Sequence, residues 1–453
     1  MPGAPHTSAT TLEDWLARVT NKQVRVGVVG LGYVGLPLTL LFSEQGIRVT
    51  GFDIDGAKVA RLAKGESYIH RILPEHIAAA QRAGFTATSD FAQAAGLDAV
   101  LICVPTPLND DHTPDMSYVV ATIEALAPHL RAGQLVVLES TTYPGTTEEI
   151  IGAAIDRLSS AKVLRAIDGA TNLDGIMVAF SPEREDPGNI TTPRRDIPKI
   201  IGGIDARASQ AAAALYATIF HRTVTMSSTA AAEMTKLLEN IYRCVNIALV
   251  NELKQLCLRM GIDIWEVIDA AATKPFGFQP FYPGPGVGGH CIPVDPFYLS
   301  WKAEQFGFAT RFIQLAGQVN EAMPLHVVEA VASALQSAGK QLSGARILVL
   351  GIAYKKDVDD LRESPSLTII EQLQEAGAVV SYNDPFFPTV GSGRKYQLNM
   401  ASAPLTNLAE YDAVVIATDH SAYDYNFIVT ESNLVIDSRN ATRNITSPKI
   451  VRC

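Results

Sequence analysis

The chain has 453 residues, of which 47% are hydrophobic and 19% charged, and its formal net charge is −10. This length suits roughly three domains of about 150 residues each, and the composition argues against intrinsic disorder. The acidic balance argues against nucleic acid or an anionic membrane surface as the main partner, although a local pocket can still bind an anionic small molecule.

Targeting and redox signals point to a reduced, cytoplasmic protein. No apolar run approaches the roughly 18 residues of a membrane span, and residues 1–22 lack the basic start and apolar stretch of a signal peptide. The five cysteines, at positions 103, 244, 257, 291 and 453, are odd in number and scattered, which does not suggest a disulfide framework. A free thiol in such a compartment can act as a nucleophile.

The first recognisable element is a strand, turn, helix and strand over residues 24–55. "VRVGVVG" suits a buried parallel strand, "LPLTLLFSEQG" suits a helix ending at Gly46, and "RVTGFDID" is a second strand. This order is a βαβ unit. We expect further strands near 97–107, 133–141 and 175–183.

The turn of this unit has the dinucleotide-binding pattern. Gly30, Gly32 and Gly35 form GxGxxG between strand and helix, where glycines permit a tight turn and close approach to a pyrophosphate. Asp53 follows the next strand, 23 residues after Gly30. A carboxylate there accepts hydrogen bonds from ribose hydroxyls and repels a 2′-phosphate, so NAD is favoured over NADP.

The middle of the chain, residues 228–272, has long helical periodicity. We interpret Cys244 and Cys257 as small fillers of that helical pattern, and Cys103 as a filler of a strand. Cys453, the last residue, is expected at a frayed end. Lys236 and Asn240 are four residues apart and therefore point to one side of the helix, although a solvated helix face explains them equally well.

A single thiol lies in the stiff loop "GPGVGGHCIPVDP", which spans residues 284–296. A thiol among glycines and prolines is displayed rather than packed. No CxxC or HxxxH partner lies nearby, which argues against a metal site. A nucleophilic role for Cys291 needs a thiolate, a nearby cation and a carbonyl to attack.

The βαβ pattern returns in residues 344–385, and "YDAVVIATDH" and "SNLVIDSRN" follow the pattern of the earlier strands. This second copy has only Gly351 at its turn, so we expect it to bind something other than a second dinucleotide. The sequence thus predicts an α/β protein with two Rossmann-like doubly wound domains. The expected segments are an extension (1–22), an NAD-binding domain (23–220), a central helical domain (221–330) and a second Rossmann-like domain (331–453).

Over nearly its whole length the chain resembles the UDP-glucose/GDP-mannose dehydrogenases. The motifs that support this are "GLGYVGLPL", "VPTP", "ESTTYPGTT", "SPER", "EMTKLLEN", "GPGVGGHCIPVDP" and "GIAYKKDVDDLRESPS", in this order. The resemblance implies two Rossmann-like domains joined by a long central helix, with residues 221–330 as the dimerisation and active-site domain and residues 331–453 as the UDP-sugar-binding domain. It also implies two-step oxidation of a sugar-nucleotide primary alcohol to a carboxylate, which supplies surface polysaccharide synthesis.

The resemblance also implies residue roles. The implied catalytic residues are Cys291 as nucleophile, Asp295 with a bound water, Lys236 and Asn240 at the oxyanion, and Thr141 and Glu183. The implied NAD contacts are Gly30, Gly32, Tyr33, Val34, Gly35, Asp53, Thr106, Thr141 and Arg362. The implied substrate contacts are Glu183, Arg184, Lys236, Asn240, Gly288, Gly289 and Lys356, the two glycines presenting backbone N–H groups to the sugar.

These roles account for the displayed thiol. An aldehyde cannot itself lose hydride, whereas its thiohemiacetal with Cys291 can, and the resulting thioester is hydrolysed by a water that Glu183 or Asp295 activates. "SPEREDPGN" replaces the PEFLxEG pattern typical of UDP-glucose enzymes. This favours a UDP-N-acetylhexosamine, with UDP-N-acetylglucosamine first and the galacto and manno epimers left open.

Three alternatives give different products. If UDP-glucose is the substrate, the chain belongs to another branch of the same family. A single-step alcohol dehydrogenase does not need Cys291. A binding module that holds NAD and a sugar nucleotide shows no turnover. Two, one or no NADH per substrate separates the two-step enzyme, the single-step enzyme and the module. The resemblance further implies a homodimer or higher homo-oligomer.

Overall fold

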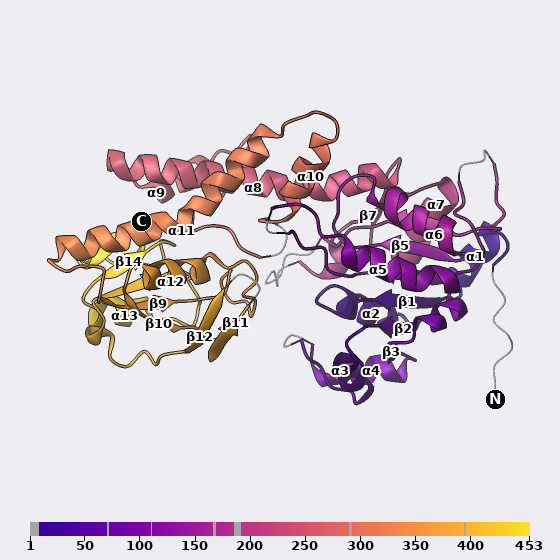
Figure 1. The fold of residues 1–453 in the computed structure, drawn as a ribbon, viewed down its shortest axis with the longest axis horizontal. Helices are drawn as coiled ribbons and strands as arrows, with labels where there is room; N and C mark the ends of the chain where they lie inside the picture. The colour runs from indigo at the N-terminus through magenta and orange to yellow at the C-terminus, as the bar shows by residue number, and fades with distance from the viewer. Residues whose placement is uncertain are drawn as a thin grey trace. The chain divides into compact units, whose positions relative to one another are not determined.

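The computed structural model describes residues 9–69, 72–109, 111–165, 169–184, 192–289, 292–393 and 396–453. The chain forms two compact units: unit 1 contains residues 1–239 and 301–306, and unit 2 contains residues 240–300 and 307–453. Each unit has a sheet covered by helices, mostly parallel in unit 1 and fully parallel in unit 2 (Figure 1). The predicted α/β class with two doubly wound domains and a long central helix is therefore confirmed, while the domain limits stay a prediction.

Unit 1 is built on an eight-stranded sheet with the order β3-β2-β1-β4-β5-β6-β7-β8. The strands from β3 to β6 are parallel, whereas β7 pairs antiparallel with β6 and parallel with β8. The strands are β1 (Arg25–Val29), β2 (Arg48–Phe52), β3 (Thr86–Thr88), β4 (Ala99–Ile102), β5 (Leu135–Leu138), β6 (Met177–Phe180), β7 (Lys199–Gly203) and β8 (Thr223–Thr225).

Helices cover both faces of this sheet, which is why its central strands are continuous apolar runs. Trp15, Phe42 and Tyr216 bring α1, α2 and α7 into the core on one face, and Ile123 and Ile155 bring α5 and α6 into the core on the other. The helices and short helical turns are α1 (Leu12–Thr20), α2 (Gly35–Glu44), α3 (Gly56–Ala63), α4 (Pro74–Arg82), η1 (Phe91–Gly96), α5 (Ser117–Leu126), η2 (Ala127–His129), η3 (Thr147–Gly152), α6 (Ala153–Leu158), η4 (Arg194–Asp196) and α7 (Ala206–Ala217).

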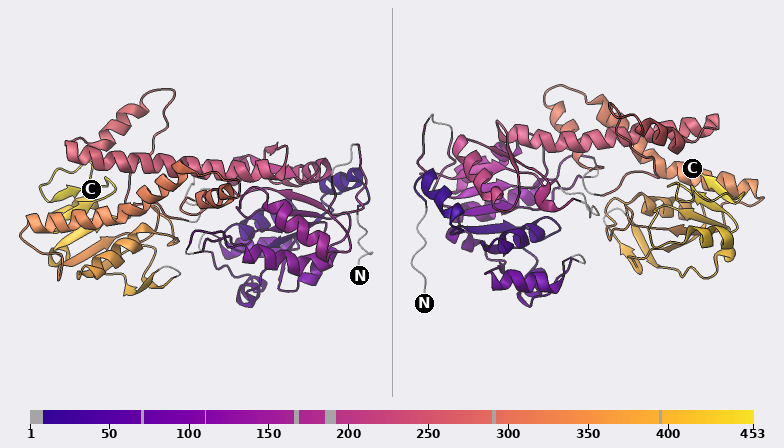
Figure 2. Two further views of the ribbon diagram at one scale, coloured as in Figure 1. Left: turned by 45° about the horizontal axis from the view of Figure 1, so that its top comes forward. Right: turned by 180° about the vertical axis from the view of Figure 1, so that it is seen from behind.

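The central segment forms one long helix followed by a shorter one. α8 (Thr229–Met260) has 32 residues and is drawn as one unbroken helix in Figure 2. It ends where Gly261 adopts a left-handed φ of 69°, and the Asp263 carboxylate then caps α9 (Ile264–Ala272). Among the helices in the described part of the chain, none combines the length and the apolar character needed to cross a bilayer.

Unit 2 contains a five-stranded parallel sheet with the order β10-β9-β13-β14-β15, and a separate hairpin of β11 and β12. Helices α11 and α12 contribute to the core on one face and α13 to the core on the other. The remaining elements of the chain are α10 (Asp295–Glu304), of which residues 301–304 belong to unit 1, and, within unit 2, α11 (Arg311–Ser337), β9 (Arg346–Leu350), α12 (Pro365–Glu375), β10 (Val379–Asn383), β11 (Thr389–Ser392), β12 (Gln397–Ala401), η5 (Leu408–Glu410), β13 (Ala413–Ile416), α13 (Tyr425–Glu431), β14 (Val435–Asp437) and β15 (Ile450–Arg452).

The cysteines outside the glycine loop are packed. Cys244 is buried on α8, and Cys103 and Cys257 are partly buried, which agrees with the filler interpretation. The expectation of a frayed end at Cys453 is wrong. β15 pairs with β14, the Cys453 N–H donates to the carbonyl of Asp437 at 3.1 Å, and burial raises the pKa of its thiol to about 11.

Candidate active site

The glycine turn between β1 and α2 leaves room for a ligand at one position only. Gly30 has a φ of +89°, and a Cβ on Gly35 would lie 1.9 Å from the Gly30 carbonyl oxygen. A Cβ on Gly32, in contrast, would meet no atom within 4 Å. Gly30 and Gly35 are therefore required by the fold of unit 1 itself, whereas the open space beside Gly32 suits the close approach of a pyrophosphate. Tyr33 and Val34 complete this turn.

Asp53 lies next to this turn, as the motif predicts. Its carboxylate is 7% exposed and accepts hydrogen bonds from the N–H groups of Leu31 at 3.0 Å and Asp55 at 2.9 Å. The ammonium of Lys58 lies 3.5 Å from Oδ2. A carboxylate fixed in this way beside a glycine turn is placed to accept from vicinal ribose hydroxyls.

The loops after β4 and β5 are tied together at the carboxyl edge of the same sheet. Thr106 donates from its hydroxyl to the carbonyl of Thr141 at 2.8 Å, and Ser140 donates to the carbonyl of Val104 at 2.7 Å. Thr106 is buried and Thr141 is partly exposed. Ligands of doubly wound sheets bind at this edge, and both threonines lie there, while their contacts to NAD stay a prediction.

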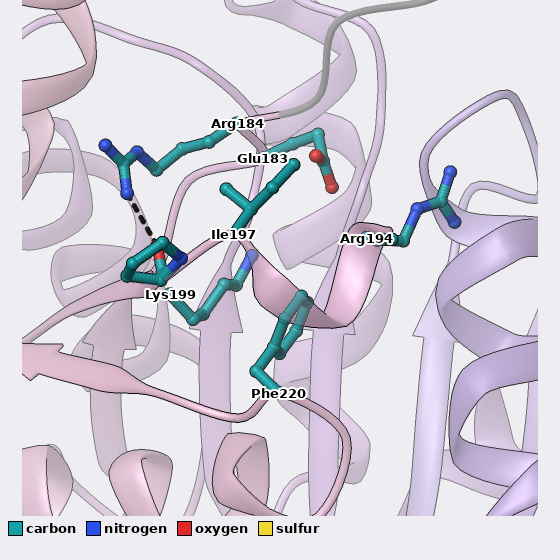
Figure 3. A pocket seen from close by; sticks show the side chains of 7 residues that line it. Glu183, Arg184, Arg194, Ile197, Lys199 and Phe220 are labelled. Carbon is teal, nitrogen blue, oxygen red and sulfur yellow. Dashed lines mark hydrogen bonds between the residues drawn. The ribbon is translucent and has the colours of Figure 1, made fainter. Parts of the chain in front are cut away.

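Glu183 and Arg184 follow β6 and line a small pocket shown in Figure 3. The Arg184 guanidinium forms a two-pronged ion pair with Glu239, at 2.5 and 3.2 Å, and donates to the carbonyl of Pro198 at 2.6 Å. The volume of about 10 Å³ suits a single water molecule. Arg194, Ile197, Lys199 and Phe220 contribute to its wall.

Lys236 lies on the part of α8 that belongs to unit 1 and is only 4% exposed. No described residue hydrogen-bonds to its ammonium or forms an ion pair with it. A buried cation without a protein partner is costly, so this ammonium is suited to an anionic group of a ligand.

Two predicted residues meet in unit 2. The Asn240 amide donates to the Asp295 carboxylate, and Arg243 donates to the amide oxygen of Asn240. Asn240 is fully buried and Asp295 is 1% exposed. The contact brings the first residue of α10 to α8, and it fixes the orientation of the carboxylate.

The glycine loop packs on the segment that follows β9 in unit 2. The N–H of Gly289 donates to the carbonyl of Arg362 at 2.8 Å, and a Cβ on Gly288 would lie 2.6 Å from the Cβ of Tyr354. Close packing on this segment therefore explains why both positions are glycines, without requiring that their backbone N–H groups contact a sugar. His290 and Cys291 lie outside the described residues, so the nucleophile role of Cys291 stays a prediction.

The two cations predicted from the second domain lie on this same segment, with local partners. Lys356 lies 3.9 Å from a carboxylate oxygen of Asp419, and Arg362 donates to Asp360 at 2.7 to 3.1 Å. Both side chains are nearly half exposed. Their predicted contacts to substrate and NAD stay predictions.

Comparison with known proteins gives three matches that together cover most of the chain. Residues 24–220 match the NAD binding domain of the UDP-glucose/GDP-mannose dehydrogenase family, residues 230–322 its central domain and residues 348–444 its UDP binding domain. The chain belongs to the UDP-glucose/GDP-mannose dehydrogenase family. It is therefore an NAD-dependent nucleotide-sugar dehydrogenase.

Three relatives within this dehydrogenase family illustrate its neighbourhood. The chain is 33% identical to a UDP-N-acetyl-D-glucosamine 6-dehydrogenase of Pseudomonas aeruginosa, over 89% of this chain and 92% of that one. It is 34% identical to an NDP-N-acetyl-D-galactosaminuronic acid dehydrogenase of Ralstonia nicotianae, over 91% and 95%. The solved structure of a UDP-D-ManNAc dehydrogenase from Pyrococcus horikoshii matches with a TM-score of 0.82 and 32% identity, over 94% and 98%.

The structure of this dehydrogenase adds residues that sequence reasoning missed. Lys58 lies in the first turn of α3, five positions after Asp53. A lysine this close to the predicted ribose-binding aspartate could have been identified from the sequence. Arg439 follows β14 and packs so closely that a Cβ on Gly284 would lie 2.7 Å from its guanidinium. Lys199 and Glu139 are buried next to the Glu183 loop, and no local sequence pattern indicated that they form an ion pair.

Proposed function

We propose that this dehydrogenase oxidises the C6 hydroxymethyl group of a UDP-N-acetylhexosamine, first of all UDP-N-acetylglucosamine, to the uronic acid with two NAD. The observation that supports this most directly is Lys236, a buried ammonium with no partner among the described residues, in the "EMTKLLEN" motif of the family. A fixed cation in a dry site stabilises oxygen that gains negative charge in both oxidations.

The NAD site is the turn at Gly30, Gly32 and Gly35. The open space beside Gly32 admits the pyrophosphate, and the carboxylate of Asp53, already oriented by the Leu31 N–H, accepts from the ribose. When bound, NAD accepts the hydride in each oxidation. Thr106 and Thr141, joined by their hydrogen bond, close the neighbouring edge of the sheet.

The first oxidation converts the CH₂OH group to an aldehyde with loss of one hydride and one proton. In the second, the Cys291 thiolate adds to the aldehyde carbon, and the thiohemiacetal formed loses a hydride and a proton to become a thioester. Water then replaces sulfur at the acyl carbon, which releases the carboxylate and the thiol. Lys236 stabilises the oxyanion of the thiohemiacetal and of the hydrolysis step.

Two carboxylates are candidates for activating the hydrolytic water. Asp295 is oriented by the Asn240 amide, and Glu183 lines the pocket after β6. Replacing each by its amide, Asp295→Asn and Glu183→Gln, distinguishes them, because loss of the base lets the thioester accumulate. Accumulation of a covalent UDP-sugar adduct in one variant, seen by intact-protein mass spectrometry, identifies the base.

The sugar preference rests on the segment that begins at Ser181. The Arg184 guanidinium is held by Glu239 and the carbonyl of Pro198, so the segment leaves the sheet from a fixed point. The three relatives described above are all named for N-acetylated sugars that differ in configuration. We infer a pocket for the acetamido group, which discriminates strongly against the plain sugar when its polar groups are left unpaired.

We also propose a homodimer through the part of α8 that belongs to unit 2. Leu249, Leu256 and Met260 on this helix are each at least half exposed, and Leu258, Ile262 and Val267 are also exposed on α8, the turn after it and α9. Apolar exposure on this scale marks an interaction surface. Light scattering that gives the mass of a monomer at micromolar concentration would contradict the dimer.

The experiment that tests the function is a panel of UDP-sugars with NAD, followed by NADH absorbance and product mass. We expect the highest kcat/KM for UDP-N-acetylglucosamine and two NADH per sugar. Faster turnover of UDP-glucose reassigns the substrate, one NADH per sugar indicates a single-step alcohol dehydrogenase, and tight binding without NADH indicates a binding module.

A further inference from the structure

A buried ionic cluster lies below the Glu183 loop in unit 1. The ammonium of Lys199 donates to Glu139 at 2.5 Å and to the backbone carbonyls of Ser181 at 3.3 Å and Pro182 at 3.0 Å. Tyr216 donates from its hydroxyl to the other oxygen of Glu139. The side chains of Lys199 and Glu139 are 4% and 0% exposed, so the cluster is sealed inside the unit.

The cluster joins the ends of neighbouring strands. Glu139 follows β5 and directly precedes Ser140 and Thr141, whereas Ser181 and Pro182 follow β6 and directly precede Glu183. Because β7 runs antiparallel to β6, with Phe180 opposite Gly202, its first residue, Lys199, reaches this same carboxyl edge. Figure 3 shows Lys199 and Glu183 in the wall of one pocket.

Stability alone does not account for this cluster. A buried ion pair is often no better than apolar side chains of similar volume, and here burial raises the pKa of Glu139 while Lys199 opposes that rise. A pair of apolar side chains could not bind the backbone carbonyls of Ser181 and Pro182, whereas the Lys199 ammonium does. The Lys199 ammonium also lies 5.0 Å from the Tyr216 ring centre and 5.6 Å from that of Phe220, which confine it from below.

We propose that Lys199, fixed by Glu139 and Tyr216, is a positioning residue that holds the Glu183 and Thr141 loops in register at the active edge of unit 1. The proposal rests on the proposed function of Glu183 and Thr141. Lys199 touches neither substrate nor cofactor in this scheme. It acts by drawing the Ser181 and Pro182 carbonyls toward Glu139, which sets the direction in which the next residue leaves the sheet.

The test compares two buried cations of unit 1, Lys199 on β7 and Arg207 on α7. Lys199→Met removes the carbonyl clamp, and the double variant Lys199→Met/Glu139→Gln also removes the carboxylate that would otherwise be buried without its partner. The matched control is Arg207→Met. Arg207 pairs with Asp205 at 2.7 Å, is 5% exposed, and holds the carbonyls of Arg165 and Asn172 at the opposite edge.

We expect Lys199→Met to lower kcat by roughly tenfold to a hundredfold, the range that a displacement of about 1 Å produces, with the KM for NAD changed less than about twofold because Asp53 and the glycine turn are untouched. The double variant should regain melting temperature relative to Lys199→Met but not kcat. Recovery of kcat together with melting temperature, or an equal loss of kcat in Arg207→Met, would overturn the proposal.

A second readout separates this proposal from the proposed function. Hydrogen exchange of the free protein, without any sugar nucleotide, reports the loops directly. We expect Lys199→Met to speed exchange in residues 140–142 and 181–184, and Arg207→Met to leave these amides unchanged. Unchanged exchange in Lys199→Met overturns the positioning role even if the enzyme is active, whereas a wild-type protein that oxidises no UDP-sugar overturns the proposed function alone.

Discussion

Replacing Asp53 by asparagine should erode the preference for NAD without disturbing the glycine turn. An asparagine oxygen can still accept from the Leu31 N–H, which the carboxylate accepts at 3.0 Å, whereas alanine would leave that N–H without a partner. The substitution therefore removes the charge and keeps the contact to the glycine turn, and it gives up only the hydrogen bond that the second carboxylate oxygen accepts from the Asp55 N–H at 2.9 Å. Lys58, at 3.5 Å from Asp53, is then released to attract a phosphate.

The size of the effect follows from two contributions. Hydrogen bonds to a charged group contribute about 1.5 to 3 kcal/mol, so losing the charge should lower kcat/KM for NAD by roughly tenfold to a hundredfold. Two like charges about 4 Å apart repel by about 4 kcal/mol at an effective dielectric constant of 20. Removing this repulsion raises kcat/KM for NADP, so the NAD to NADP ratio should fall by at least about a hundredfold.

The assay is kcat/KM for both cofactors at saturating UDP-sugar. Asp55→Asn is the matched control, because Asp55 is exposed and caps α3 through its Oδ1, a role that asparagine fills equally well. Its cofactor ratio should stay within about twofold of the wild type. A wild-type enzyme that uses NAD and NADP equally, or an Asp53→Asn variant with an unchanged ratio, would refute the assignment of Asp53 to the ribose.

Further predictions concern the glycine turn, the thiol and a buried lysine. Gly32→Ala should keep the melting temperature but lose NAD affinity in calorimetry, whereas Gly35→Ala, whose Cβ would lie 1.9 Å from a carbonyl oxygen, should lose stability as well; equal melting temperatures would contradict this. Cys291→Ala should abolish acid formation from the sugar-nucleotide aldehyde and NAD while both ligands still bind, and near-normal acid formation would exclude the thioester. Burial lowers the pKa of Lys254 to about 8, below its unfolded value of about 10.4, so the folded protein loses this proton at a lower pH than the unfolded chain. Burying the charged ammonium costs on the order of 3 kcal/mol of folding stability. This cost is present in full below pH 8 and disappears as the pH rises to about 10.4. Lys254→Met should therefore raise the melting temperature most at neutral pH, and a gain that does not shrink by pH 10 would contradict this origin.

Much of the fold is readable from local sequence because it follows from burial. The strands of both sheets are β-branched runs covered on two faces, and the turn at Gly30 has flanks that few other structures produce. The end of α8 at Met260 could also have been read from Gly261. Cys453 was misjudged because its burial depends on the pairing of β15 with β14, which is a contact remote in sequence.

The residues of the candidate site also fall into those that local sequence predicts and those that depend on contacts remote in sequence. Asp53 and the glycines belong to a compact motif whose spacing encodes its chemistry, and they were predicted. Lys199 was not, because nothing in "RRDIPKIIGG" reveals that β7 reverses direction. Strand direction is set by packing of the whole sheet, so the partner of Glu139 emerges only in three dimensions.

The reversed direction of β7 also bears on how the chain connects this strand to β6. Because β6 ends and β7 begins at the same edge of the sheet, residues 181–198 leave and rejoin the scaffold at neighbouring points. Such a connection needs no crossover helix, unlike a connection between neighbouring parallel strands. The register of the strands that carry the glycine turn and Asp53 therefore does not depend on the length of this connection.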